Sequence, residues 1–243
     1  MPSNRIQAVL LDMGGVILRM AGGHGFPHSR LDWRGRQAVL QAMAKGGSKV
    51  SLEDLEAVVF APWHAEYNRR EEMGKEASWS LHLQRLRNRF GGGLGDLELL
   101  ELWFRPYGEH LLPTEGAQEA LEELGEMDLK LALVSNVPLP GQLYGDVLER
   151  HGLKAPFDCL LFSYDEGSRK PSPALLRLAM SKLGSDPAAT IMVGDRRERD
   201  IAAGRFAGTR TVWIRRSDSG GSEADATIDS VNQLPDLLRR WQR

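Results

Sequence analysis

Four groups of polar residues stand where short apolar runs of the sequence end. They are Asp12 with Gly14-Gly15, Ser135-Asn136, Lys170 before Pro171, and Gly194-Asp195 with Asp200. An aspartate can act as a nucleophile or as a ligand to a hard metal ion, and a lysine ammonium can offset negative charge in a site. Taken singly, each group is as typical of a turn, a helix cap or a solvated charge. Chemistry would require a fold that brings the four groups together.

The apolar runs before these groups predict strands of a parallel sheet. They cover residues 8–11, 129–134, 159–162, 190–193 and 211–214, and a last short strand is expected near 226–228. Helical patterns with apolar residues on one face lie between them, at 117–124 and 175–183. Strands that alternate with helices favour an α/β fold whose sheet is covered on both faces. Ligands of such sheets lie beyond the carboxyl ends of the strands, so we expect the four groups to meet in one crevice.

The segment 19–110 has a different pattern, with no convincing strand and several amphipathic helical stretches. Ser51 followed by Asp54 resembles a capping box that opens a helix over 52–60, and Asp96 is expected to cap a helix over 97–104. We predict that residues 1–18 and 111–243 form an α/β core. Residues 19–110 are predicted to form an inserted helical domain.

The composition excludes several classes of function. The 243 residues carry 31 basic and 33 acidic side chains, and a net charge of -2 gives no general attraction to nucleic acid or to an anionic membrane. The single cysteine, Cys159, excludes an intrachain disulfide and fits a reducing cytoplasm. No apolar stretch approaches the roughly 18 residues needed to span a bilayer. We expect a soluble cytoplasmic protein without nucleic-acid or membrane partners, and the sequence gives no sign of its oligomeric state.

Together, the four groups resemble the four motifs of the haloacid dehalogenase superfamily, most of whose members are magnesium-dependent phosphohydrolases. The matching stretches are "AVLLDMGGVI", "LALVSN", "SRKPSPALLRLAMSKLG" and "IMVGDRRERDIAAGRFAGTRTVWI", in the order and with the spacing of the family. The resemblance covers about residues 6–18 and 112–214. It implies a Rossmann-like, doubly wound parallel sheet with an inserted α-helical cap domain.

The resemblance also implies catalytic and metal-binding roles. Asp12 would attack phosphorus and form an aspartyl-phosphate, while Lys170 and a Mg²⁺ ion would offset the charge of the phosphate. The magnesium ligands would be the Asp12 carboxylate, the Gly14 backbone carbonyl and the Asp195 carboxylate. Asp200 would hold a metal-bound water or orient Lys170.

The resemblance further implies that the phosphate-binding part of the site is formed by Ser135, Asn136 and Gly14. Ser135 would donate its hydroxyl to a phosphate oxygen, and backbone N–H groups near Asn136 and Gly14 would complete the cradle. The implied activity is hydrolysis of a small phosphorylated metabolite. The helical insertion would then act as a cap that excludes water and sets the choice of substrate.

Gly14 departs from the family pattern. Phosphatases of this superfamily usually carry at that position a second aspartate, which acts as general acid and general base. A glycine keeps the backbone ligand but removes the proton donor, which is typically worth ~10²- to 10⁴-fold in rate. A glycine could also be required there for its backbone angles.

Two alternative functions stay open at this point. Gly14 supports a catalytically weak or silent family member that binds a phosphorylated ligand or a protein partner. A 2-haloacid dehalogenase would use Asp12 on carbon and need no magnesium, which the acidic pattern of Asp195 and Asp200 disfavours.

Overall fold

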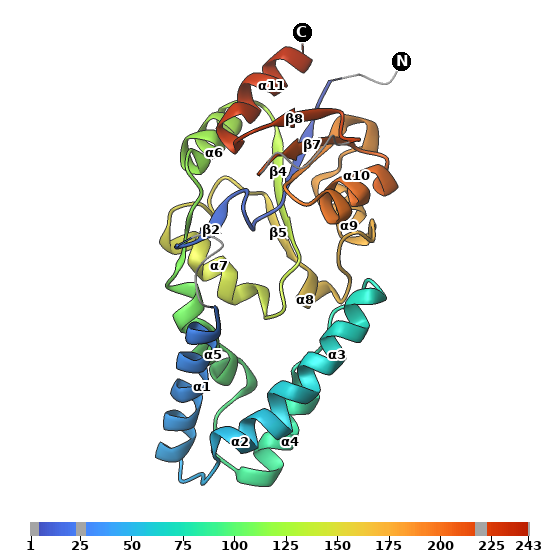
Figure 1. Ribbon diagram of the computed structural model, residues 1–243. Coiled ribbons are helices and arrows are strands. Elements are labelled where there is room, and N and C mark those ends of the chain that lie inside the picture. The colour runs from blue at the N-terminus through green and yellow to red at the C-terminus, as the bar shows by residue number, and fades with distance from the viewer. Residues whose placement is uncertain (1–4, 23–27, 217–222, 243) are drawn as a thin grey trace.

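The centre of the protein is a six-stranded sheet in which all neighbouring strands are parallel (Figure 1). The computed structural model describes residues 5–22, 28–216 and 223–242. The strand order is β5-β4-β1-β6-β7-β8. The strands are β1 (Ala8–Leu11), β4 (Lys130–Ser135), β5 (Cys159–Phe162), β6 (Thr190–Gly194), β7 (Arg210–Ile214) and β8 (Ala226–Ile228). The predicted α/β fold with a parallel sheet is thereby confirmed.

Helices cover both faces of this sheet because its strands bury side chains on both sides. Ala8 and Leu10 of β1 belong to a core shared with α9 and α10, whereas Val9 and Leu11 belong to the core shared with α6, α7 and α11. The bounds are α6 (Ala117–Glu126), α7 (Gly141–Arg150), α8 (Ser163–Glu166), α9 (Ala174–Leu183), α10 (Ala202–Ala207) and α11 (Leu234–Trp241). Alternating side chains on a continuously apolar strand thus hold two helical layers in place.

A helical segment lies below the sheet in Figure 1. It consists of α1 (His28–Lys45), α2 (Leu52–Leu55), the π-helical turn η2 (Glu56–Phe60), α3 (Ala61–Glu72), α4 (Ser80–Phe90) and α5 (Asp96–Gly108). An antiparallel ribbon of β2 (Leu18–Met20) and β3 (Leu111–Pro113) joins it to the core. This ribbon crosses the predicted boundary at residue 18. The division into two domains stays a prediction.

The starts of two helices can be compared with the capping residues that the sequence predicts. The capping box is confirmed, because Ser51 Oγ accepts from the Asp54 backbone N–H at 3.1 Å while Asp54 Oδ2 accepts from the Ser51 N–H at 3.1 Å. The helix that it opens runs through η2 into α3, beyond the predicted end. Asp96 was expected to cap its helix, and this is wrong: Gly95 occupies the cap position, and Asp96 lies in the first turn, where it pairs with Arg87.

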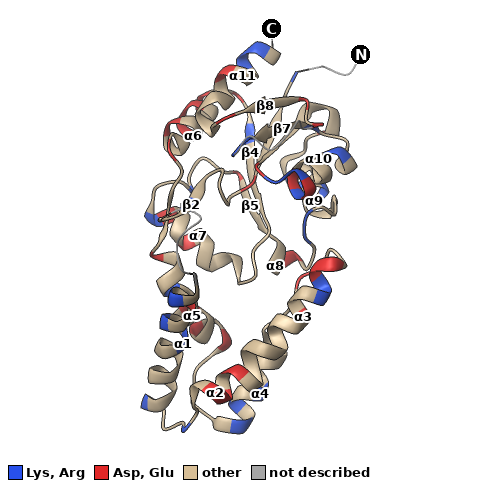
Figure 2. Ribbon diagram, viewed as in Figure 1, with Lys and Arg blue, Asp and Glu red and all other residues tan. Residues whose placement is uncertain are grey.

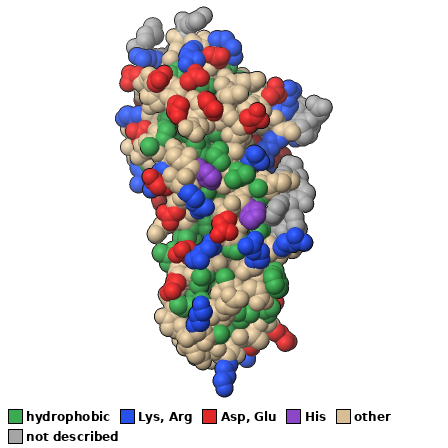
Figure 3. Space-filling model, turned by 90° about the vertical axis from the view of Figure 1, so that its left-hand side faces the viewer, with side chains coloured by type: hydrophobic (Ala, Val, Ile, Leu, Met, Phe, Trp, Pro, Cys, Tyr) green, Lys and Arg blue, Asp and Glu red, His purple; other side chains and the backbone are tan. Residues whose placement is uncertain are grey.

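The surface shows no large patch of one charge on the face drawn in Figure 3, where acidic and basic side chains are interspersed. That arrangement agrees with the net charge of -2. Among the described residues, no helix is both long and apolar enough to cross a membrane.

Candidate active site

The four predicted groups lie around one cavity of about 690 Å³. Strands β4, β1 and β6 are neighbours in the sheet, so the residues that follow them meet at one edge. The predicted site residues that line the cavity are Asp12, Gly14, Ser135, Asn136, Lys170, Asp195 and Asp200. The structure therefore brings together every residue that the sequence singled out for this site.

Lys170 is the central cation of the site. Its Nζ lies 2.7 Å from Asp12 Oδ1 and 2.6 Å from Asp200 Oδ1, and it donates to the Val134 carbonyl at 2.7 Å. Its side chain is only 1% exposed. Burial alone would lower the pKa of Lys170, but the two carboxylates outweigh it and raise the pKa above its ordinary value. The ammonium therefore keeps its charge at neutral pH.

Three carboxylates form a cluster that fits a divalent cation. Asp12, Asp195 and Asp200 each offer an oxygen within 4.8 Å of the others. Asp195 Oδ2 pairs with Arg216 Nε at 2.7 Å, whereas the buried Asp195 Oδ1 has no hydrogen-bond partner among the described residues. A buried carboxylate oxygen without a donor is costly unless a cation or water satisfies it. This oxygen and its two acidic neighbours are the hard ligands that Mg²⁺ prefers.

Two carboxyl groups of the cluster, Asp195 and Asp200, hold protons more tightly than isolated carboxyl groups do. Burial, followed by the negative charge of Asp12, raises the pKa of Asp195. Burial raises the pKa of Asp200 to about 6, against the opposing effect of Lys170. A bound cation would favour the ionised forms of both groups.

The segment after β6 supplies Asp200 to this cluster. The π-helical turn η4 (Arg197–Ile201) carries Asp200, whose Oδ2 accepts from the Arg196 backbone N–H at 2.9 Å. A Cβ atom on Gly194 would collide with the Asp200 side chain, so a glycine is required at the end of β6. Asp200 thus has one oxygen on the backbone and one on Lys170, an arrangement suited to the predicted orienting of that lysine.

Ser135 is the last residue of β4, and Asn136 follows it at the cavity. Ser135 is buried and lines the cavity. The Asn136 side chain forms two hydrogen bonds with the backbone of Lys170: its Nδ2 donates to the carbonyl at 2.8 Å, and its Oδ1 accepts from the N–H at 2.9 Å. The amide therefore fixes the lysine segment, and the predicted substrate-binding role of Asn136 stays a prediction.

Gly14 does not need the conformational freedom of glycine. Its φ lies outside the left-handed region, unlike that of Gly15 at 76°. A Cβ atom on Gly14 would have Asp12 Oδ2 as its nearest neighbour, at 3.9 Å. The expectation that backbone angles could require this glycine is wrong, and a side chain can be accommodated beside Asp12.

Sequence reasoning missed a second set of charged residues next to these groups. Arg169 is buried and contacts side chains of the helical segment, and Arg199 contacts the same segment at the rim of the cavity. The available signal was position alone, because Arg169 directly precedes Lys170 and Arg199 directly precedes Asp200.

The fold and the site define a Rossmann-like α/β enzyme whose polar residues converge at the carboxyl ends of parallel strands. A family model described as haloacid dehalogenase-like hydrolase matches residues 6–208. The chain belongs to this family.

Relatives of known activity include several phosphatases. The chain is 32% identical over 221 residues to phosphoserine phosphatase of Thermus thermophilus, covering 86% of this chain and 82% of that protein. It is 30% identical over 241 residues to N-acetylmuramic acid 6-phosphate phosphatase of Pseudomonas putida, covering 96% of each chain. A ribulose-1,5-bisphosphate 5-phosphatase of Halopiger xanaduensis is 31% identical over 153 residues, 58% of this chain and 63% of that protein.

Solved structures share the fold over nearly the whole chain. A 2-haloacid dehalogenase from Pseudomonas syringae superposes with a TM-score of 0.65 at 22% identity, covering 97% of this chain and 99% of that one. A HAD phosphatase from Thermococcus onnurineus gives a TM-score of 0.62 at 24% identity, covering 96% and 98%. At these identities the likeness concerns the fold.

Proposed function

We propose that this protein is a magnesium-dependent phosphohydrolase that cleaves a small phosphorylated metabolite through an aspartyl-phosphate on Asp12. The observation that supports it most is the buried Lys170 ammonium held between Asp12 and Asp200. Beside it lies Asp195 Oδ1, which accepts no hydrogen bond from the described part of the chain. Such a set can bind a phosphate dianion next to a carboxylate nucleophile, because positive charge offsets the repulsion between the two anions. The single cysteine, Cys159, supports a cytoplasmic setting.

The two carboxylate oxygens of Asp12 have different surroundings, which supports different roles for them in the reaction. Oδ1 accepts from Lys170, while Oδ2 faces the open space beside Gly14. We assign Oδ2 as the attacking atom. Its bond to phosphorus would form as the ester oxygen leaves, and water would then release phosphate from Asp12 in a second displacement. Ser135 would donate to a phosphate oxygen, and Lys170 would hold its charge at both steps.

A divalent cation would be held by Asp12 and Asp195, with the Gly14 carbonyl as the third protein ligand. When bound, it supplies positive charge to the phosphate and the nucleophile. Asp200 would keep Lys170 in place through their ion pair of 2.6 Å. Two relatives that align over more than four fifths of both chains are phosphatases by name, which supports a phosphate ester as substrate.

Gly14 favours a second candidate, a family member that binds a phosphorylated ligand but turns it over slowly or not at all. The same residue on an active enzyme favours substrates whose leaving group departs without protonation, such as a sugar 1-phosphate or an acyl phosphate. The 2-haloacid dehalogenase reading is disfavoured, because attack on carbon has no use for the acidic pair Asp195 and Asp200.

The test is a screen of the purified protein against phosphorylated metabolites, with Mg²⁺ and with excess chelator. We expect phosphate release that requires Mg²⁺ in the wild type and is lost in Asp12→Asn, while the melting temperature of the variant stays close to that of the wild type. Beryllofluoride should bind the wild type at Asp12. Turnover by Asp12→Asn would contradict the mechanism, and ligand binding without turnover of any substrate would support the binding protein.

A further inference from the structure

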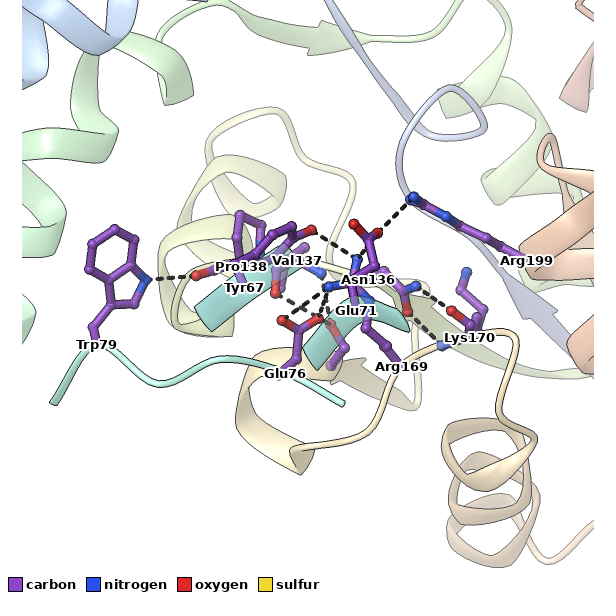
Figure 4. Close-up of polar contacts among 11 residues, drawn as sticks. Tyr67, Glu71, Glu76, Trp79, Asn136, Val137, Pro138, Arg169, Lys170 and Arg199 are labelled. Carbon is purple, nitrogen blue, oxygen red and sulfur yellow. Dashed lines mark hydrogen bonds and ion pairs between the residues drawn. The ribbon is translucent and has the colours of Figure 1, made fainter. Parts of the chain in front are cut away.

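The end of α3 contacts the two loops that carry Lys170 and Asp200. Glu71 Oε1 accepts from Arg169 Nη2 at 2.9 Å and from Arg199 Nη2 at 2.9 Å (Figure 4). Arg169 directly precedes Lys170 in the chain, and Arg199 directly precedes Asp200. One carboxylate oxygen of the helical segment therefore joins the neighbours of two site residues. In Figure 2 the charged end of α3 lies beside the segment that leads into α9.

Arg169 is anchored by more than Glu71. Its side chain is 3% exposed and lies 3.3 Å from the Oε1 of Glu76, which is itself 2% exposed. Arg169 Nη2 also donates to Tyr67 Oη at 2.9 Å, and the Ser163 hydroxyl donates to Glu76 Oε1 at 2.6 Å. A buried guanidinium with several partners holds one orientation, because leaving any of its N–H groups unpaired would be costly.

The backbones of the two segments are paired as well. The Arg169 N–H donates to the Gly74 carbonyl at 3.1 Å, and Lys75 forms an isolated antiparallel bridge with Ser168. Nearby, Trp79 Nε1 donates to the Pro138 carbonyl at 2.8 Å, three residues after Ser135. The turn after α3 thus docks directly on the loops that follow the sheet.

These contacts close a ring. Glu71 links Arg169 and Arg199, each arginine is bonded to its neighbour in the chain, and Lys170 and Asp200 form an ion pair of 2.6 Å. Because Glu71 contacts both arginines, a displacement of α3 would move both the Lys170 loop and the Asp200 loop. Either arginine alone would connect α3 to only one of these loops. Glu71 is the residue of the helical segment that contacts both arginines.

We propose that Glu71 is a positioning residue, through which docking of α3 sets the relative orientation of Lys170 and Asp200. The expected effect on kcat rests on the proposed phosphohydrolase function. The expected effect on the two loops does not. With Glu71 in place, the ammonium of Lys170 is aligned for the phosphate. Without it, the substrate still binds while the reacting groups are less well aligned.

The experiment compares Glu71→Gln with Glu72→Gln, a change at the next residue, which is exposed and forms no ion pair with other described residues. With p-nitrophenyl phosphate and Mg²⁺, we expect kcat of Glu71→Gln to fall about tenfold while KM stays within about twofold, because a small misplacement of reacting groups costs rate. Amide hydrogen exchange should become faster in 168–171 and in 198–201. Glu72→Gln should match the wild type in all three measurements.

Several outcomes would overturn the positioning role. They are an unchanged kcat in Glu71→Gln, an equal loss in Glu72→Gln, or a loss of kcat with unchanged exchange in both loops. If Glu71→Gln does not fold, Arg199→Gln removes the contact of Glu71 with the half-exposed arginine and leaves the contact with Arg169. This variant must show a lower kcat with an unchanged KM, and faster exchange in 198–201. If the wild type turns over no phosphate ester, the proposed function fails, and the exchange measurement still decides the inference.

Discussion

Gly14 supplies no side-chain proton donor for the leaving group beside Asp12, yet the space for one is present. The nearest atom to an added Cβ is Asp12 Oδ2 at 3.9 Å, and the backbone has no left-handed angle that would strain another residue. The general acid is therefore absent from position 14 because glycine has no side chain, and a substitution at this position can test whether it is restored.

We predict a steep dependence of kcat on the leaving group in the wild type, with aryl and acyl phosphates far faster than alkyl phosphates. Gly14→Asp should raise the alkyl phosphate rate, toward the ~10²- to 10⁴-fold typical of general acid catalysis. Gly14→Asn is the matched control, because it has the same size and cannot supply the proton. A flat, fast profile in the wild type would mean that another residue protonates the leaving group.

The acidic cluster predicts a pH dependence of metal binding. Asp200 has a pKa of about 6, and the pKa of Asp195 is raised by burial and by Asp12, so protons compete with the cation. Calorimetric titration with Mg²⁺ should show weaker binding and greater proton release near about pH 5 than near about pH 7.5. Equal affinities and no proton release would contradict a cation bound next to these carboxylates.

The raised pKa of Asp200 also predicts how the stability of the metal-free protein depends on pH. Because the folded state binds the Asp200 proton more tightly than the unfolded state, the contribution of Asp200 to stability is present at low pH. It is lost as the pH rises from 3.8, the ordinary pKa of an aspartate, through about 6. Added Mg²⁺ should restore stability at the higher pH, which thermal unfolding in chelator and in Mg²⁺ would measure.

Asp12, Ser135 and Asp195 were predictable because each lies at the end of a strong strand signal. Lys170 and Asp200 lie farther from a strand and were predictable from the distinctive spacing of the motifs. The Glu71 contacts were not, because they join residues 98 and 128 positions apart in the chain. No periodicity or local pattern marks a side chain whose partner is set by the packing of a separate segment. Asn136 illustrates the intermediate case: its place in the site was predicted, whereas its bonds to the Lys170 backbone required the structure.

At the scale of elements, the apolar runs identified the six strands of the sheet but not the ribbon of β2 and β3. Both ribbon strands have three residues, too few for an alternating pattern to be recognised. The tryptophans show the same limit. All three of Trp33, Trp63 and Trp79 lie in the helical segment, yet Trp63 and Trp79 stack in its core with ring centroids 3.9 Å apart, whereas Trp33 is 56% exposed.

The capping box at the start of α2 supports a prediction about stability. Ser51→Ala removes the hydrogen bond to the Asp54 N–H, and loss of a cap costs about 1 kcal/mol in the free energy of unfolding. Ser48→Ala is the matched control three residues earlier, because the buried Ser48 Oγ has no hydrogen-bond partner within the described chain. Chemical denaturation should distinguish the two variants. Equal stabilities would show that the box contributes nothing to the folded protein.

At the scale of the whole molecule, the helical segment is attached to the core on two sides of the site. The β2–β3 ribbon provides one attachment, and the docking of α3 and its following turn on the Lys170 loop provides the other. This arrangement supports the proposed role of the segment as a cap over the cavity. It also explains why a contact in α3 can affect groups that belong to the sheet.

The ribbon has a further consequence for how such a protein can change over evolutionary time. Met20 pairs with Leu111, so the chain leaves the core and returns to it at adjacent positions. Segments with neighbouring ends can be lengthened, shortened or replaced with little disturbance of the fold that hosts them. Substrate preference could therefore diversify among descendants through exchange of the inserted helices, while the inherited reaction chemistry of the sheet is retained.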